Sequence, residues 1–287
     1  MSEVQTIVDT IQIEVLDMPQ IRDTMAIKQL GQNKMMNALC KVNTHSVYGE
    51  EESSTFKRYV ENTTEVIVNS DIGDNKYMVN RFDIAIDTNL YNFYDDFKKL
   101  MYFGELISMR SVKDKRCNRW YTVNINTLEK NSVKLKHSRD LNIEIYDKKN
   151  ECASYPYETR IEFRYDRKRR ELEKCEEYFY TTIELINAML GNIERVNLSM
   201  VERLIKLYEK ECNKGLVKSF SEFVRKYNDY FYTLDILKGV YDGIGLKGSY
   251  NTWLKKFRIT NNLYFMTKTD VKEFIRFTVK SVKQYMK

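Results

Sequence analysis

The segment 141-LNIEIYDKKNECASYPYETRIEFR-164 contains two stretches of alternating apolar and polar residues joined by a polar loop. Apolar side chains occupy every second position from Leu141 to Ile145 and again from Ile161 to Tyr165. Alternation of this kind predicts two β-strands that each bury one face in a core. The opposite face of the pair then carries a tyrosine, two carboxylates and two arginines: Tyr146, Glu144, Glu162, Arg160 and Arg164.

A third predicted strand, residues 76–87, adds two aspartates, Asp83 and Asp87, to the polar face. They lie about 13 Å apart along a straight strand, whereas neighbouring strands lie about 4.8 Å apart. Direct binding of one metal ion by both aspartates is therefore not expected, and Asp83 or Asp87 could instead join Glu144 or Glu162 from a neighbouring strand. Carboxylate oxygens grouped in this way suit Mg²⁺ or Mn²⁺. The alternative is that these carboxylates face water or pair with the arginines of the same strands: Arg81, Arg160 and Arg164.

Tyr146 ends the first strand of the pair and is followed closely by Lys148 and Lys149. A tyrosine can attack a phosphodiester, but its free pKa is near 10, so the phenolate needs help from neighbouring positive charge. Lysines and a metal ion would supply that charge and stabilise the reacting phosphate. Tyr155 and Tyr157 are rival nucleophiles in the loop. The chain has 21 tyrosines, so an ordinary tyrosine at a strand end is the alternative.

Composition excludes several classes of protein. The two histidines, His45 and His137, are far apart, and no GxxxxGK[ST] motif occurs, so paired-histidine metal sites and ATPases have no support. The five cysteines form no CxxC pair, which argues against a disulfide framework and a zinc site and favours a reduced, cytoplasmic setting. The N-terminus does not have the pattern of a signal peptide, and no apolar run reaches the roughly 20 residues of a membrane helix.

Positive charge is concentrated near the end of the sequence. The whole chain has a net charge of +6, whereas residues 241–287 alone carry +7. A basic segment on a near-neutral body favours a polyanion partner such as DNA. The alternative is a lysine-rich surface that is simply exposed to water.

The remaining patterns predict an α+β fold. Further strands are expected at 5–16, 56–69, 107–111, 119–125 and 133–136, and a helix at 90–103 that Gly104 ends. After residue 167 the pattern becomes helical, with Ser199 as a helix cap, a glycine-rich loop at 237–248 and a last helix at 270–286. We therefore predict a mostly antiparallel sheet with packed helices in a catalytic domain, 1–167, followed by a helical, basic DNA-binding region, 168–287.

Three short motifs occur in the order RFDIAIDT (81–88), RDLNIEIYDKKNE (139–151) and YETRIEFR (157–164). This order resembles the replication initiation factor family, the rolling-circle initiators of Gram-positive plasmids with relatives in filamentous phages. The resemblance covers roughly residues 76–170. It implies metal-dependent nicking of one DNA strand at an origin, with the tyrosine of the Tyr-Asp-Lys-Lys motif joined covalently to the 5′ phosphate.

Carried over by position, the resemblance implies a role for each site residue. Tyr146 would be the nucleophile, and Lys148 and Arg160 would contact phosphate. A Mg²⁺ or Mn²⁺ ion would be held by three carboxylates: Asp83, Asp87 and Glu162. The implied partners are origin DNA, a host helicase and polymerase, and a second copy of the chain in a homodimer.

The sequence also departs from the family pattern. His137-Ser138-Arg139 stands where Gly-Ser-Arg is usual, and Glu144 stands where an arginine is usual. These departures leave open a non-catalytic DNA-binding factor that controls plasmid or phage replication. In either case origin binding is expected in the basic C-terminal helices, whose lysines can contact phosphates. A third alternative is a structural protein whose charges are solvated.

Overall fold

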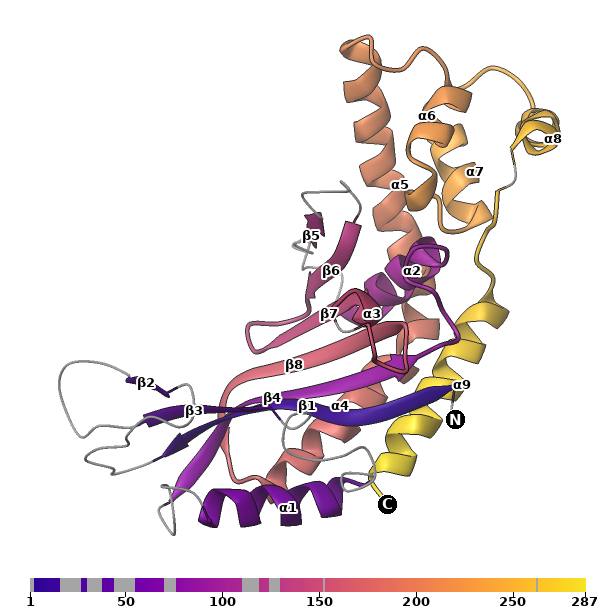
Figure 1. The fold of residues 1–287 in the computed structure, drawn as a ribbon. Helices are drawn as coiled ribbons and strands as arrows, with labels where there is room; N and C mark the ends of the chain where they lie inside the picture. Colours follow the sequence, from indigo (N-terminus) through magenta and orange to yellow (C-terminus); the bar gives the residue numbers. More distant parts are fainter. Residues whose placement is uncertain are drawn as a thin grey trace.

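A computed structural model of the protein describes residues 3–15, 27–29, 38–43, 55–69, 76–109, 119–123, 130–151, 153–261 and 263–287. Within these ranges eight strands form one antiparallel sheet in the order β2-β3-β1-β4-β8-β7-β6-β5 (Figure 1). The strands are β1 (Val4–Val15), β2 (Ile27–Gln29), β3 (Ala38–Asn43), β4 (Tyr77–Thr88), β5 (Arg119–Val123), β6 (Lys130–Lys136), β7 (Leu141–Asp147) and β8 (Thr159–Arg170). The predicted hairpin is confirmed as β7 and β8.

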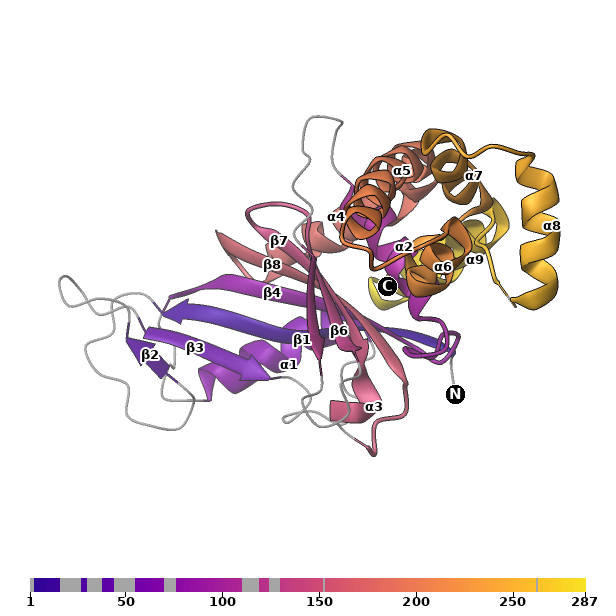
Figure 2. The same cartoon turned by 90° about the horizontal axis from the view of Figure 1, so that it is seen from above.

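Helices pack against the sheet and continue into a helical C-terminal region (Figures 1 and 2). They are α1 (Phe56–Val68), α2 (Phe97–Ser108), α3 (Lys148–Glu151), α4 (Glu176–Asn187), α5 (Met189–Asn213), α6 (Phe220–Lys226), α7 (Leu234–Gly243), α8 (Tyr250–Thr260) and α9 (Lys268–Tyr285), with 3₁₀ turns η2 (Glu173–Cys175) and η3 (Asn228–Tyr230). The predicted α+β class is confirmed. None of the helices in the described ranges is both long and apolar enough to cross a bilayer.

The two faces of the central strands differ as the alternation predicts. Register pairs Ile143 of β7 with Phe163 of β8, and both side chains are fully buried on the apolar face. Helices α1, α2 and α9 cover this face, and α4 packs on it through Tyr178 and Phe179 against Phe82 of β4. The contact with α9 includes a buried hydrogen bond of 2.7 Å between the hydroxyls of Thr6 and Ser281. The polar side chains are therefore gathered on the opposite face.

The strand predicted for residues 56–69 is wrong, because this segment forms α1. The Thr55 hydroxyl caps the helix by accepting from the Arg58 backbone N–H. The residues that α1 buries fall on one helical stripe, and Phe56 on that stripe packs against Phe82 of β4 and Phe179 of α4. Packing and capping therefore outweigh the extended-chain preference of the β-branched residues in this segment.

The prediction that Gly104 ends a helix is also wrong. The helix α2 begins at Phe97 and continues past Gly104 to Ser108, so residues 107 and 108 are helical and not the predicted strand. A Cβ atom at Gly104 would overlap Leu135 and lie 3.1 Å from Cδ1 of Ile145. The glycine is needed for the close approach of α2 to β6 and β7.

Boundaries in the C-terminal region differ from those predicted. Ser199 lies inside α5 and is not the helix cap that was predicted. The helix α7 spans Leu234–Gly243, so residues 237–243 of the predicted loop are helical. The last helix starts at Lys268 behind a capping box made by Thr267 and Asp270. The strand β8 continues to Arg170, three residues beyond the composition change at 167.

Candidate functional site

The polar face of β1, β4, β7 and β8 carries a buried cluster of ionisable side chains. Asp83, Asp87 and Arg160 are 0% exposed, and Glu162 is 3% and Tyr146 7% exposed. Charged groups are rarely buried to this extent unless they are paired or coordinate a metal. Each charged side chain of this cluster therefore requires a partner that compensates its charge.

Three carboxylates from three strands converge on one point. Asp9 of β1, Asp83 of β4 and Glu162 of β8 each offer an oxygen, and these oxygens lie within 4.8 Å of one another. Asp9 reaches the group from a β-bulge, because the β1–β4 register shifts between Val8 and Thr10. A group made only of carboxylate oxygens has the donor chemistry that Mg²⁺ and Mn²⁺ prefer. We refer to these three residues as the carboxylate cluster.

Two arginines compensate part of the negative charge. The Arg81 Nε atom donates to both carboxylate oxygens of Asp83, at 2.9 and 3.0 Å, and Arg164 Nη2 donates to Glu162 Oε1 at 2.7 Å. Burial nevertheless raises the pKa of Asp83 to about 7; the negative charge of Glu162 adds to this effect, and Arg81 and Arg164 oppose it. Removal of the Asp83 carboxyl from water is the largest cause of this shift, and Arg81, Arg164 and Arg160 each contact a member of the cluster.

The hydroxyl of Tyr146 lies beside the carboxylate cluster. It donates a hydrogen bond of 3.1 Å to Oε2 of Glu162. The β7–β8 register pairs Glu162 with Glu144, two residues along the strands from the Tyr146–Arg160 pair and on the same face. Lys148 follows at the start of α3, with Nζ 5.7 Å from the centre of the Tyr146 ring. A tyrosine hydroxyl, a carboxylate and an ammonium group thus lie close together on this face.

Asp87 is not a member of the carboxylate cluster and is linked to it through Arg160. Arg160 holds it with two hydrogen bonds, from Nε to Oδ1 at 2.5 Å and from Nη2 to Oδ2 at 2.9 Å. Arg160 Nη1 also contacts Asp9. Of the carboxylates predicted to hold a metal, the structure thus brings together Asp83 and Glu162, while Asp87 pairs with an arginine.

The rival tyrosines of the loop are held differently from Tyr146. Tyr155 donates to Asp87 Oδ2 at 2.6 Å and accepts from Arg160 Nη2 at 2.8 Å. Burial, and then the charge of Asp87, raise the pKa of Tyr155 far above its ordinary value of 10. Tyr157 is buried, and the two ring centres lie 6.1 Å apart. The Tyr155 hydroxyl is thus engaged by the Asp87–Arg160 pair.

Glu144 occupies the outer part of the same face. It pairs with Lys134 of β6 at 2.9 Å and with Arg164 at 3.4 Å. Its carboxylate is thus engaged by two cations. Of the two glutamates that could join Asp83, Glu162 is the one whose carboxylate lies beside it.

Asp9 is the site residue that sequence reasoning missed. Its signal is a break in the alternation of β1: Val4 and Val8 are buried at even positions, whereas Ile11, Ile13 and Val15 are buried at odd positions. A change of phase within one strand indicates a bulge. The charged residue at that point is therefore a candidate for the polar face.

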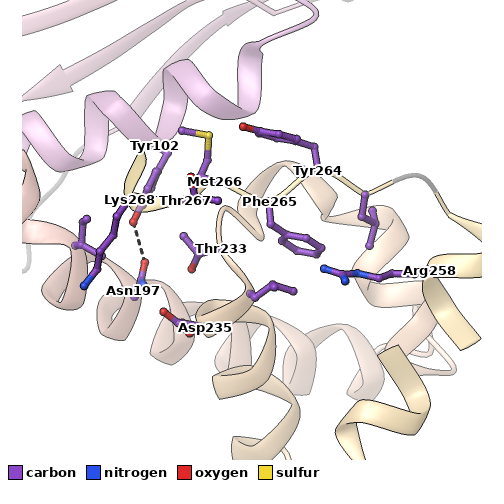
Figure 3. A pocket seen from close by; sticks show the side chains of 13 residues that line it. Tyr102, Asn197, Thr233, Asp235, Arg258, Tyr264, Phe265, Met266, Thr267 and Lys268 are labelled. Atoms are coloured by element: carbon purple, nitrogen blue, oxygen red, sulfur yellow. Dashed lines mark hydrogen bonds between the residues drawn. The ribbon is translucent and has the colours of Figure 1, made fainter. Parts of the chain in front are cut away.

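A separate cavity of about 370 Å³ lies in the helical region and contains none of the predicted site residues (Figure 3). The Tyr102 hydroxyl at its wall donates to Asn197 Oδ1 at 3.2 Å. Two other polar groups of the wall, Thr233 and Thr267, cap α7 and α9. These polar atoms are used in holding the helices together.

Comparison with known proteins gives one weak similarity. No family model and no curated protein matches the chain. A solved structure of the rolling circle replication initiator protein from Geobacillus stearothermophilus is 12% identical to this chain, with a TM-score of 0.33, and the match covers 58% of this chain and 76% of that chain.

Proposed function

We propose that this protein is a rolling-circle replication initiator that nicks and rejoins one DNA strand through a covalent bond to Tyr146. The observation that supports the proposal is the 3.1 Å hydrogen bond from the Tyr146 hydroxyl to Glu162, a member of the carboxylate cluster. The site thus has a nucleophile, a proton acceptor and oxygen ligands on one rigid sheet. In this proposal residues 1–167 carry the chemistry and residues 168–287 contribute DNA binding.

The nicking step follows from these positions. The Tyr146 oxygen attacks phosphorus while its proton passes to Oε2 of Glu162. The bond from phosphorus to the 3′ oxygen breaks, and that oxygen takes up a proton as a free 3′ hydroxyl. The 5′ phosphate stays on Tyr146 as a phosphodiester, so the reverse attack by a 3′ hydroxyl rejoins the strand without another energy source.

Other side chains position and stabilise the reacting groups. Asp9, Asp83 and Glu162 would hold a Mg²⁺ or Mn²⁺ ion, whose charge stabilises the phosphate oxygens. Lys148 adds positive charge beside the Tyr146 ring. Arg160 acts as a positioning residue in this proposal, because it is fully buried and its donors are directed at Asp87, Asp9 and Tyr155.

The test is a covalent-adduct assay with supercoiled DNA that carries the origin of the protein's own replicon, in the presence of Mg²⁺ or Mn²⁺. The wild-type protein is expected to give a nicked circle and a protein–DNA adduct that persists in a denaturing gel. Tyr146→Phe should abolish the adduct, whereas Tyr155→Phe and Tyr157→Phe should retain it. Asp9→Asn should reduce the amount of adduct, and a higher concentration of Mg²⁺ or Mn²⁺ should restore part of it. An adduct that persists in Tyr146→Phe contradicts the assignment of the nucleophile.

The second candidate is a non-catalytic DNA-binding factor on the same fold. It is favoured by the way in which Arg81 and Arg164 already engage Asp83, Glu162 and Glu144. On this alternative no metal produces a nick, Tyr146→Phe changes nothing, and binding to DNA weakens as salt rises. Origin DNA is the partner in both cases, while a host helicase, a polymerase and a homodimer stay predictions of the family resemblance.

A further inference from the structure

A groove on the helical region combines a basic helix face with two tyrosines. It has a volume of about 560 Å³ and lies between α5 and the turn η3. From α5 come the basic residues Arg203, Lys206 and Lys210, and from η3 and the residue before it come Tyr230 and Tyr227. We call these five residues the α5 groove. In Figure 1, α5 projects beyond the sheet, so the groove is separate from the carboxylate cluster.

The cations of the groove follow helical spacing. Arg203, Lys206 and Lys210 are three and four residues apart, so they share one face of α5 over about 10 Å of helix axis. Within the described part of the chain neither Lys206 nor Lys210 makes an ion pair, and both are exposed. Two unpaired ammonium groups one helical turn apart form a row suited to successive phosphates.

The acidic residues close to the groove do not cancel this row. Glu105 lies 3.7 Å from Arg203, and Glu211 pairs with Lys226 at 2.6 Å, so each is already matched with a cation. Glu202 and Glu209 also belong to α5 but are not among the residues that line the groove. A net positive charge therefore remains at the lysines.

The tyrosines give the groove a second chemical character. Tyr227 and Tyr230 are partly exposed, and their ring centres lie 6.4 Å apart. Partly exposed aromatic rings beside a row of cations are the features with which proteins bind single-stranded nucleic acid: bases stack on the rings and phosphates follow the cations. In a duplex the faces of the bases are stacked on each other and cannot reach rings inside a groove.

We propose that the α5 groove binds single-stranded DNA, with phosphates on Lys206 and Lys210 and bases against Tyr227 and Tyr230. The inference rests on the proposed function for the source of that strand, because nicking at an origin gives a strand that can be displaced. It adds a binding site for the product strand on the helical region, distinct from the site of the chemistry.

The experiment measures binding of a fluorescent 12-mer oligo-dT by anisotropy at several salt concentrations, without divalent metal. For Lys206→Ala/Lys210→Ala we expect weaker binding and a decrease of about 1.4 in the slope of log affinity against log salt, about 0.7 for each lost phosphate contact. Lys57→Ala/Arg58→Ala removes two charges from α1, at the far end of the molecule in Figure 1, and should leave the slope unchanged.

A second pair of variants tests stacking. Tyr230→Leu is expected to weaken oligo-dT binding about 5- to 150-fold, whereas Tyr230→Phe keeps a ring and should bind like the wild type. Thermal unfolding of each variant shows that the fold is retained. Equal binding by Tyr230→Leu and Tyr230→Phe would overturn the stacking role, and an unchanged salt slope in the lysine variant would overturn the proposal. Equal losses for oligo-dT and a duplex of the same length would overturn its preference for a single strand.

The two proposals fail separately. Tyr146→Phe should bind oligo-dT with wild-type affinity whatever the adduct assay shows, because Tyr146 lies on the sheet and not in the groove. Lys206→Ala/Lys210→Ala should still form the adduct when the DNA is saturating. Loss of oligo-dT binding in Tyr146→Phe would overturn the assignment to the α5 groove.

Discussion

Replacing Arg160 with methionine separates a structural role of this arginine from direct contact with phosphate. Its side chain is completely buried and donates to Asp87, Asp9 and Tyr155. Methionine has a similar length but no donors, so the fully buried Asp87 carboxylate would lose its charge partner. Removing one member of a buried pair costs about 3–5 kcal/mol. We expect Arg160→Met to lower the free energy of unfolding by that amount in urea denaturation.

Two further variants serve as controls for this prediction. Lys149→Met breaks an ion pair with Glu158 in which the lysine is 47% exposed, and it should cost less than about 1 kcal/mol. The double variant Arg160→Met/Asp87→Asn also removes the fully buried Asp87 charge, so that Asp9 is the carboxylate left without its arginine contact. It should be more stable than Arg160→Met by about 1–3 kcal/mol. Activity then distinguishes the roles. If the double variant recovers stability and also recovers adduct formation, Arg160 acts through Asp87. A cost below about 1 kcal/mol for Arg160→Met would refute the reasoning.

Two other predictions concern the interior. Burial lowers the pKa of Lys98 to about 8 from 10.5, so between these pH values the unfolded chain binds a proton that the folded chain has released. The stability of the wild type relative to Lys98→Met should therefore rise from pH 8 to about 10.5, by about 1–3 kcal/mol, in urea unfolding at several pH values; a flat or falling difference contradicts the assignment. Gly104→Ala should lower the free energy of unfolding by about 1–3 kcal/mol because its Cβ would overlap Leu135. Gly191→Ala in α5 should raise it by about 0.5–1 kcal/mol, because the new Cβ meets no neighbouring group within 4 Å and alanine favours the helix. Equal effects of the two alanines in thermal unfolding would show that α2 can move away from the sheet.

The sequence predicts those parts of the fold in which one local pattern decides the structure. Alternation from Leu141 to Ile145 and from Ile161 to Tyr165 fixes which side chains share a face, and the observed register then puts Tyr146 and Glu162 together. The strand predicted at 56–69 failed because its β-branched residues favour extended chain, while the stripe that begins at Phe56 packs in three dimensions. That packing depends on residues far away in sequence.

The metal set illustrates a different limit of sequence reasoning. Asp83 and Asp87 lie on the same face of the same strand and are equivalent in any pattern of alternation. Their partners differ because β8 places Arg160 opposite Asp87 and Arg164 opposite Asp83. Arg160 is directed at Asp87, whereas Asp83 is held by Arg81 and faces Glu162. Only the register of three strands and the bulge at Asp9 distinguish the two aspartates.

The two networks of the polar face meet at Asp9. Arg160 contacts Asp9 through Nη1 while its other donors hold Asp87 and Tyr155, so one buried guanidinium fixes the position of an oxygen in the carboxylate cluster. Asp9 sits on a bulge, where the regular ladder does not determine the direction of its side chain. A cation that binds only the folded site stabilises the fold by mass action. Added Mg²⁺ or Mn²⁺ should therefore stabilise the wild type more than Arg160→Met, because the variant must also order Asp9 when the ion binds.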